Sequence, residues 1–148
     1  MVQRMTQVTV KRTIDAPPAV IFKTVSDIEN LPNTSEDVLR IEFLTEQRSG
    51  VGTRFRETRR MKKDKEMVTE LEVTEYDPAG RVRMVADSHG TVWDTLFTVS
   101  PEGELTISMD CRAHKLLPRL LNPLFKGMFR RGMEKHLDAL ESYCQNLA

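Results

Sequence analysis

Two oppositely charged residues on one expected strand are the strongest candidates for chemistry in this chain. Glu57 and Arg59 alternate with Phe55 and Met61, so the four side chains share a face if residues 53–61 form a strand. A paired carboxylate and guanidinium can orient the polar end of a ligand, or position a proton donor for a dehydration. The alternative is a strand end beyond the core, or a shifted register that turns both side chains to water.

The histidines offer weaker catalytic candidates. His136 falls in the apolar sector of the C-terminal segment, and His114 precedes the Leu116-Leu117-Pro118 connection. Either imidazole can serve as a base for enolisation or aldol closure, although a structural role is the simpler interpretation of each. His89 lies in a Ser-His-Gly turn and is expected at the surface. Because no histidine has a second ligand-type residue at metal spacing, we expect no metal site.

Other kinds of chemistry find no support in the sequence. There is no G-x-S-x-G, GxGxxG or Walker motif, so neither acyl-enzyme nor nucleotide chemistry is expected, and no cofactor is predicted. The 22 basic residues balance 22 acidic ones, which argues against a nucleic-acid partner. Cys111 and Cys144 both fall on expected inward positions and are predicted to be free, buried thiols.

One long C-terminal helix, from about Asn122 to Leu147, is expected to position these groups. Apolar residues three and four apart form a stripe along it, as in a half-buried helix. The stripe consists of Phe125, Phe129, Met133, Leu137, Leu140 and Cys144.

The rest of the chain alternates apolar and polar residues, as strands do. The expected strands are 7–14, 38–46, 53–61, 66–76, 81–86, 91–99 and 104–112. A short helix at 19–25 and a second towards Leu31, limited by Pro32, follow the first strand. Short connections between consecutive strands imply an antiparallel meander. With one apolar face, this sheet needs a cover, and the terminal helix is long enough to supply it.

Nearly the whole chain resembles the SRPBCC superfamily, which includes START-related lipid-transfer domains, polyketide cyclases and dehydrases, and birch-pollen-allergen-like proteins. The resemblance is carried by VKRTIDAP at 10–17, VIF at 20–22, VSDIENLP at 25–32, GVGTRF at 50–55, EYDP at 75–78 and the closing helix. It implies a single α+β domain over residues 1–148 with a helix-grip fold. In that fold a curved antiparallel sheet of about seven strands wraps the C-terminal helix, and two short helices follow strand 1.

The resemblance also implies a cavity between sheet and helix that accepts an apolar small molecule. A curved sheet and a straight helix cannot touch along their whole length, and an apolar space between them stays dry or takes apolar guests. The same side chains can instead fill an ordinary core. The expected ligand-binding residues are Phe22, Phe43, Phe55, Leu71, Met84, Trp93, Thr95, Phe97, Met109, Met128, Phe129 and Met133.

Three functions remain open from the sequence. The first is binding or carriage of a lipid, isoprenoid or polyketide-like compound without catalysis. The second, which rests on the resemblance, is a cyclase or dehydrase in which Glu57, Arg59 and a histidine do acid–base work. The third, suggested by the quinone-binding and toxin-like branches, is a protein-interaction module that presents its sheet edge or residues 116–125.

The sequence says less about membrane contact, cellular location and oligomeric state. Basic residues gather at 54–65 and at Lys126, Arg130 and Arg131. They can contact an anionic membrane transiently, or simply keep a sheet edge solvated. The chain shows no signal peptide and no run of about 18 apolar residues, so a cytoplasmic location is expected. A monomer and a homodimer are both compatible with the sequence.

Overall fold

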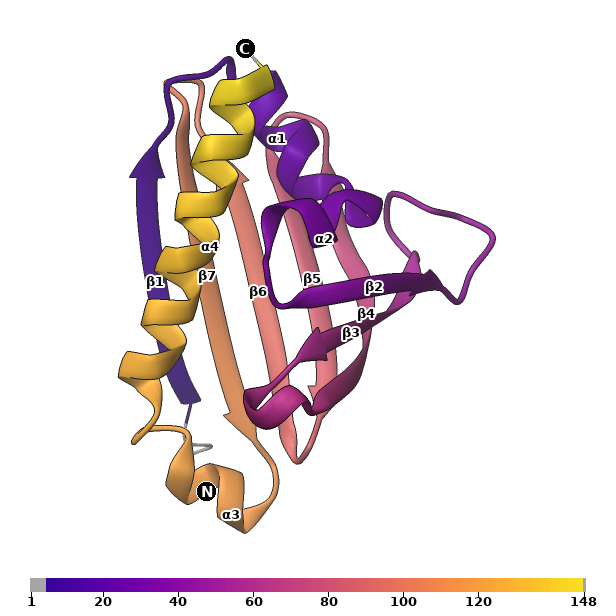
Figure 1. The fold of residues 1–148 in the computed structure, drawn as a ribbon, viewed down its shortest axis with the longest axis vertical. Helices are drawn as coiled ribbons and strands as arrows, with labels where there is room; N and C mark the ends of the chain where they lie inside the picture. The colour runs from indigo at the N-terminus through magenta and orange to yellow at the C-terminus, as the bar shows by residue number, and fades with distance from the viewer. Residues whose placement is uncertain (1–4, 148) are drawn as a thin grey trace.

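A curved, seven-stranded antiparallel sheet lies against one long helix (Figure 1). The computed structural model describes residues 5–147. Hydrogen-bonded neighbours follow the order β1-β7-β6-β5-β4-β3-β2, so the first strand along the chain pairs with the last. The strands are β1 (Met5–Thr13), β2 (Val38–Phe43), β3 (Arg54–Arg60), β4 (Glu66–Asp77), β5 (Arg81–Ser88), β6 (Thr91–Val99) and β7 (Glu104–Ala113).

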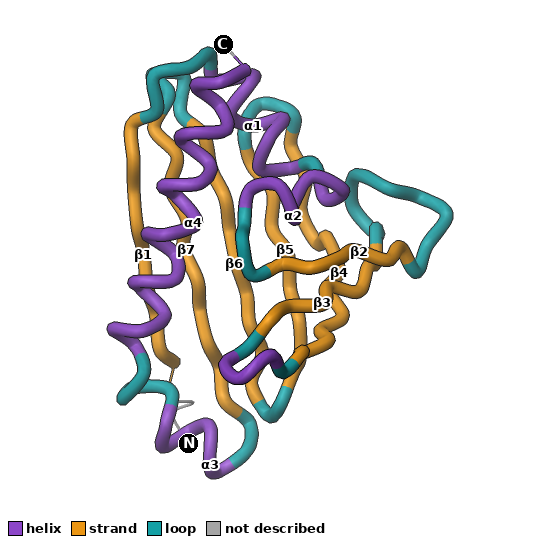
Figure 2. The backbone as a smooth tube through the Cα atoms, viewed as in Figure 1, coloured by secondary structure: helices purple, strands orange, loops and turns teal. Residues whose placement is uncertain are grey.

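The helices α1, α2 and α4 lie on the concave side of the sheet (Figure 2). The long helix packs most closely on β1, α1 and α2. Together these elements confirm the α+β arrangement expected from the sequence. The helical segments are α1 (Pro18–Ser26), η1 (Ile28–Asn30), α2 (Leu31–Thr34), η2 (Lys62–Asp64), α3 (Leu116–Leu121) and α4 (Lys126–Leu147), of which η1 and η2 are short 3₁₀ turns.

Two irregularities bend the sheet. The register shifts between Val38 and Arg40 in β2 and between Val73 and Glu75 in β4. Such bulges increase local twist and bend the strand that carries them. Figures 1 and 2 show β2 and β3 turned across the long axis that β1, β7, β6 and β5 follow. The sheet therefore curves towards the helix at the end formed by β2 and β3.

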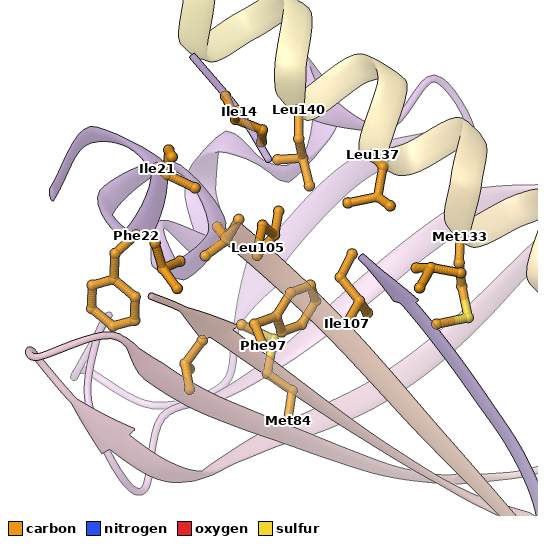
Figure 3. Packing of buried hydrophobic residues seen from close by; sticks show 14 of the residues in the cluster. Ile14, Ile21, Phe22, Met84, Phe97, Leu105, Ile107, Met133, Leu137 and Leu140 are labelled. Carbon is orange, nitrogen blue, oxygen red and sulfur yellow. The ribbon is translucent and has the colours of Figure 1, made fainter. Parts of the chain in front are cut away.

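The hydrophobic core lies between the concave face and the helices (Figure 3). Phe97 and Ile107 extend from the sheet towards Leu137 and Leu140 of α4, while Ile21 enters from α1. Leu137, Leu140 and Cys144 are almost completely buried, which confirms the inner stripe expected for the C-terminal helix. Helical spacing therefore placed these three residues on the correct face of the helix.

Two details of the expected helices are wrong. The C-terminal helix begins at Lys126 rather than Asn122, because α3 and a turn precede it. Phe125 falls outside the helix and is 41% exposed. Pro32 does not end the second short helix. It occupies the first turn of α2, where backbone N–H groups have no acceptor within the helix, so the N–H that proline lacks is not needed.

Candidate ligand-binding site

The Glu57–Arg59 pair lies on the concave side of β3. Register places Glu57 opposite Ile41 and Thr69, and Arg59 opposite Met67. An Arg59 Nη2 to Glu57 Oε1 distance of 3.0 Å and an Nε to Oε1 distance of 3.1 Å make this a two-point ion pair. The Glu57 side chain is only 12% exposed and that of Arg59 38%. Glu57 therefore fixes the guanidinium, whose remaining donors are available to a further partner.

His136 reaches the same region from α4. Its ring stands edge-on to Phe97, with centroids 6.5 Å apart and planes at 83°. The Nε2 atom is buried and has no hydrogen-bond partner among residues 5–147. Burial, and then the positive charge of Arg59, lower the pKa of His136 to about 4. The imidazole is therefore neutral near pH 7, and its Nε2 is a buried polar atom that lacks a partner.

The fold thus brings together three of the four catalytic candidates. Glu57 and Arg59 come from β3, and His136 comes from the facing side of α4. Arg59 donates hydrogen bonds, and a neutral imidazole can accept or donate one according to its tautomer. The arrangement is suited to binding a carbonyl, hydroxyl or enolate oxygen on an otherwise apolar molecule.

His114, the fourth candidate, lies elsewhere. Its Nε2 is 2.8 Å from Asp87 Oδ1, and both side chains are largely exposed. His114 follows β7, whereas Asp87 is near the end of β5, so their contact joins two strand ends. The structure gives His114 a surface hydrogen-bonding position outside the group formed by Glu57, Arg59 and His136.

The expected lining residues fall into a buried set and a partly accessible set. The buried set belongs to the core and includes Phe22, Phe55, Met84, Phe97 and Met133. The partly accessible set surrounds that core on the concave side and consists of Phe43, Leu71, Trp93, Thr95, Met109 and Phe129. Met128 belongs to neither, because it is 46% exposed on α4.

The partly accessible set includes an aromatic pair that joins sheet and helix. Trp93 of β6 and Phe129 of α4 meet edge to face, with ring centroids 5.3 Å apart. Thr95 lies between Met84 and Met109 in register on the neighbouring strands. This part of the concave face offers aromatic rings and flexible methionines, which adapt to apolar molecules of irregular shape.

Two further wall residues were absent from the expected lining. Ile41 is partly buried against the core and lies opposite Glu57, and it shares a face with Phe43. Strict alternation along β2 contained enough information to find it. Tyr76, which contacts Phe22 at 5.7 Å between ring centroids, was hidden because the bulge in β4 shifts the alternation.

The cysteines offer no nucleophile. Both are free and buried, as expected from the sequence. Burial, followed by the negative charge of Asp110, raises the pKa of Cys111 to about 12, and burial also raises that of Cys144. Both thiols therefore remain protonated near neutral pH, where the reactive thiolate would be needed. Across residues 5–147, no group of three or more His, Cys, Asp and Glu side chains is arranged to hold a metal ion.

A separate surface hollow of about 260 Å³ lies beside α1. It is formed by α1 with the turns that connect β4 to β5 and β6 to β7. None of its lining residues is acidic, basic or histidine. The hollow is therefore distinct from the acid–base group on β3 and α4.

A curved antiparallel sheet around a long C-terminal helix, with short helices after the first strand, defines a helix-grip protein. The profile of the family described as polyketide cyclase / dehydrase and lipid transport matches residues 5–145, and the chain belongs to this family within the SRPBCC superfamily.

Solved structures show the same fold at low sequence identity. A START superfamily protein from Mycobacterium smegmatis has a TM-score of 0.72 and 20% identity, over 97% of this chain and 99% of its own. A major latex-like protein from Panax ginseng has a TM-score of 0.72 and 12% identity, over 95% and 97%. A protein from Thermus thermophilus reaches 0.75 and 21%, over 97% and 99%. No curated protein matches the chain by sequence.

Proposed function

We propose that this protein binds a hydrophobic small molecule with one polar end between the concave sheet face and α4. A lipid, an isoprenoid or a polyketide-like compound has the required chemistry. The observation that carries the proposal is the buried Nε2 atom of His136, which lacks a partner within the described chain and belongs to a ring that contacts Phe97. A buried polar atom without a partner is costly, and a bound oxygen atom would satisfy it.

The surroundings of His136 support an apolar guest. Phe97 borders its ring directly, and Met133 and Leu137 flank it on α4. The nearby inner face of the sheet adds the partly accessible Leu71 and Met109. Arg59 supplies a cation for the polar end of the guest, while the remaining wall is apolar and interacts through burial. Membership in a family described by polyketide chemistry and lipid transport agrees with this class of ligand.

Binding is tested by native mass spectrometry of the purified protein together with displacement of an apolar fluorescent dye. We expect either a co-purified species or a dye that decanoic acid or another apolar competitor displaces. Met109→Trp, on the concave side of β7, should weaken dye binding by filling space. Val68→Trp, at a 48% exposed position of β4, is the matched control and should leave binding unchanged.

The absence of both a bound species and a displaceable dye would contradict the proposal. Equal dye binding by the two tryptophan variants would contradict the location. If Met109→Trp unfolds the protein, His136→Gln serves instead, because it keeps a polar side chain and changes only the group presented to the guest.

Acid–base catalysis of the cyclase or dehydrase type is a second candidate function. The specific observation in its favour is the convergence of Arg59 and His136, which comes from a different element. In this role Arg59 stabilises an enolate oxygen, neutral His136 removes a proton from the adjacent carbon, and Glu57 orients Arg59. Turnover of a polyketide-like substrate should rise with pH through about 4, as His136 loses its proton. Unchanged turnover in Glu57→Gln and His136→Gln would exclude these roles.

A further inference from the structure

We infer that the corner formed by α3 and the start of α4 docks onto an anionic lipid bilayer. This α3–α4 corner is defined here as residues 115–131. The corner lies at one end of the molecule (Figure 1), and it exposes a run of large apolar side chains. They are Leu116 (73% exposed), Leu117 (65%), Leu120 (55%), Leu124 (77%), Phe125 (41%) and Met128 (46%).

The charge of the corner is complementary to anionic lipid. Residues 113–133 contain Lys115, Arg119, Lys126, Arg130 and Arg131 but no aspartate or glutamate, although the whole chain is neutral. Among the ion pairs of residues 5–147, none involves Lys115, Lys126 or Arg131. Exposed leucines bordered by uncompensated cations are typical of helices that lie in a membrane interface.

The basic hairpin at residues 54–65 is compensated in part. Arg54 and Arg56 both contact Glu70 on the outer face of the sheet, and Arg59 pairs with Glu57. Carboxylates therefore compensate these three arginines, whereas Arg60, Lys62, Lys63 and Lys65 take part in none of the ion pairs of residues 5–147. The α3–α4 corner differs in its exposed apolar area, because its six large apolar side chains are 41% to 77% exposed, whereas Met61 (44%) is the exposed large apolar side chain of residues 54–65.

The exposure of the leucines is built into the fold. Asn122 lies inside the corner, 7% exposed, and its Nδ2 donates to Thr91 Oγ1 over 3.1 Å. The backbone N–H groups of His114 and Lys115 donate to Gly90 O over 2.8 and 3.3 Å. A polar amide thus holds the corner against β6, and the neighbouring leucines are directed outward. The polar residue of this corner is buried and its leucines are exposed, which is the opposite of the usual distribution at a protein surface. An apolar patch is thereby left available for a partner.

The bilayer accounts for both properties of the corner at once. No helix within residues 5–147 has the length and hydropathy needed to cross a membrane, so the contact proposed is interfacial. The inference does not depend on the ligand-binding proposal, because the corner lies outside the group formed by Glu57, Arg59 and His136.

Vesicle flotation of the full chain tests this inference. We expect binding to vesicles of phosphatidylcholine and phosphatidylglycerol in equal parts, and weak or no binding to phosphatidylcholine alone. Lys126→Gln with Arg131→Gln should weaken partitioning about 30-fold, since each basic side chain near an anionic surface contributes about fivefold. Leu117→Ser with Leu124→Ser should weaken it by about tenfold or more, because inserted leucines lose their apolar burial.

Matched controls separate the corner from general surface effects. Lys23→Gln on α1 and Val51→Ser between β2 and β3 alter exposed residues far from the corner and should bind like the parent protein. Circular dichroism and thermal unfolding verify that each variant is folded.

Three results would overturn the inference. One is equal partitioning of the corner variants and the parent. Another is equal binding to neutral and anionic vesicles. The third is a dimer in sedimentation that Leu117→Ser with Leu124→Ser dissociates, since a second copy would then cover the corner. If the parent protein binds anionic vesicles but binds no displaceable dye, the result would count against the ligand-binding proposal and not against membrane docking.

Discussion

The imidazole of His136 stands edge-on to the ring of Phe97, 6.5 Å away between centroids, on the inner side of α4. This contact joins the long helix to the centre of the sheet. It places a titratable ring in apolar surroundings with Arg59 as its charged neighbour. Burial of the ring connects stability to ligand binding. It disfavours protonation of His136, and the buried Nε2 has no hydrogen-bond partner in the described structure.

Protonation of His136 should therefore lower stability in acid. Its pKa is about 4 in the folded protein, against an ordinary value of 6.5. Between these values the unfolded chain binds a proton that the folded chain does not, so the free energy of unfolding rises with pH. Across the full window the effect is at most about 3 kcal/mol. Urea unfolding of the parent and of His136→Gln, measured from pH 4 to 7, should show this slope only in the parent.

The control for this experiment is His89→Gln, because His89 is an exposed turn residue. That variant should retain the pH dependence of the parent. An equally steep slope in His136→Gln would show that another group is responsible.

Arg12 should contribute to stability by connecting β1 to α4. Its guanidinium is 3.1 Å from Glu134 and 3.7 Å from Glu141, and it also hydrogen-bonds Asp138. The hydrogen bond to Asp138 is the largest cause of a raised pKa for Arg12, despite partial desolvation. Arg12→Met should lower the free energy of unfolding by about 1 kcal/mol, and less at high salt.

Arg40→Met is the matched control for Arg12. Arg40 also contacts two carboxylates, Glu42 and Glu66, but its side chain is 53% exposed, against 23% for Arg12. Its loss should change stability by no more than about 0.5 kcal/mol. Equal losses in the two variants, measured by chemical denaturation, would remove the special role assigned to Arg12.

The buried Asn122–Thr91 hydrogen bond should hold the α3–α4 corner in place. Asn122→Ala leaves the Thr91 hydroxyl without this donor and should cost about 1–3 kcal/mol. Thr91→Val in the same background should cost less than it does alone, because its partner has already been removed. Strictly additive losses in a double-mutant cycle of denaturation measurements would show that the bond makes no coupled contribution.

Two glycines should respond to alanine in opposite directions. Gly132 is in α4 with nothing within 4 Å of an added Cβ, so Gly132→Ala should stabilise the protein by about 0.5–1 kcal/mol. Gly80 has a φ of +134°, and a Cβ there would lie 2.5 Å from Val99 O. Gly80→Ala should therefore destabilise it, and thermal unfolding should move in opposite directions for the two variants. A lower melting temperature for Gly132→Ala would contradict this reasoning.

Much of the fold was predictable because its periodicities are local. Residues 91–99 alternate without interruption, and β6 has those same bounds. The inner stripe of α4 was equally clear, since Leu137, Leu140 and Cys144 recur at helical spacing. Its beginning was not, because α3 and a turn at residues 122–125 precede α4 and interrupt the helix that the apolar spacing suggested. The helix consequently starts later than its apolar pattern suggested.

The sequence by itself determined most of the residues that face inward, the order in which the elements follow, and that Glu57 and Arg59 share a face. These properties depend on neighbours along the chain, through backbone geometry and burial. Only the tertiary structure decided that His136 joins this pair while His114 does not, and that the leucines beside Asn122 remain exposed. Such outcomes depend on the bend of the sheet and on contacts between distant segments, where small shifts in register or helix start decide which side chains meet.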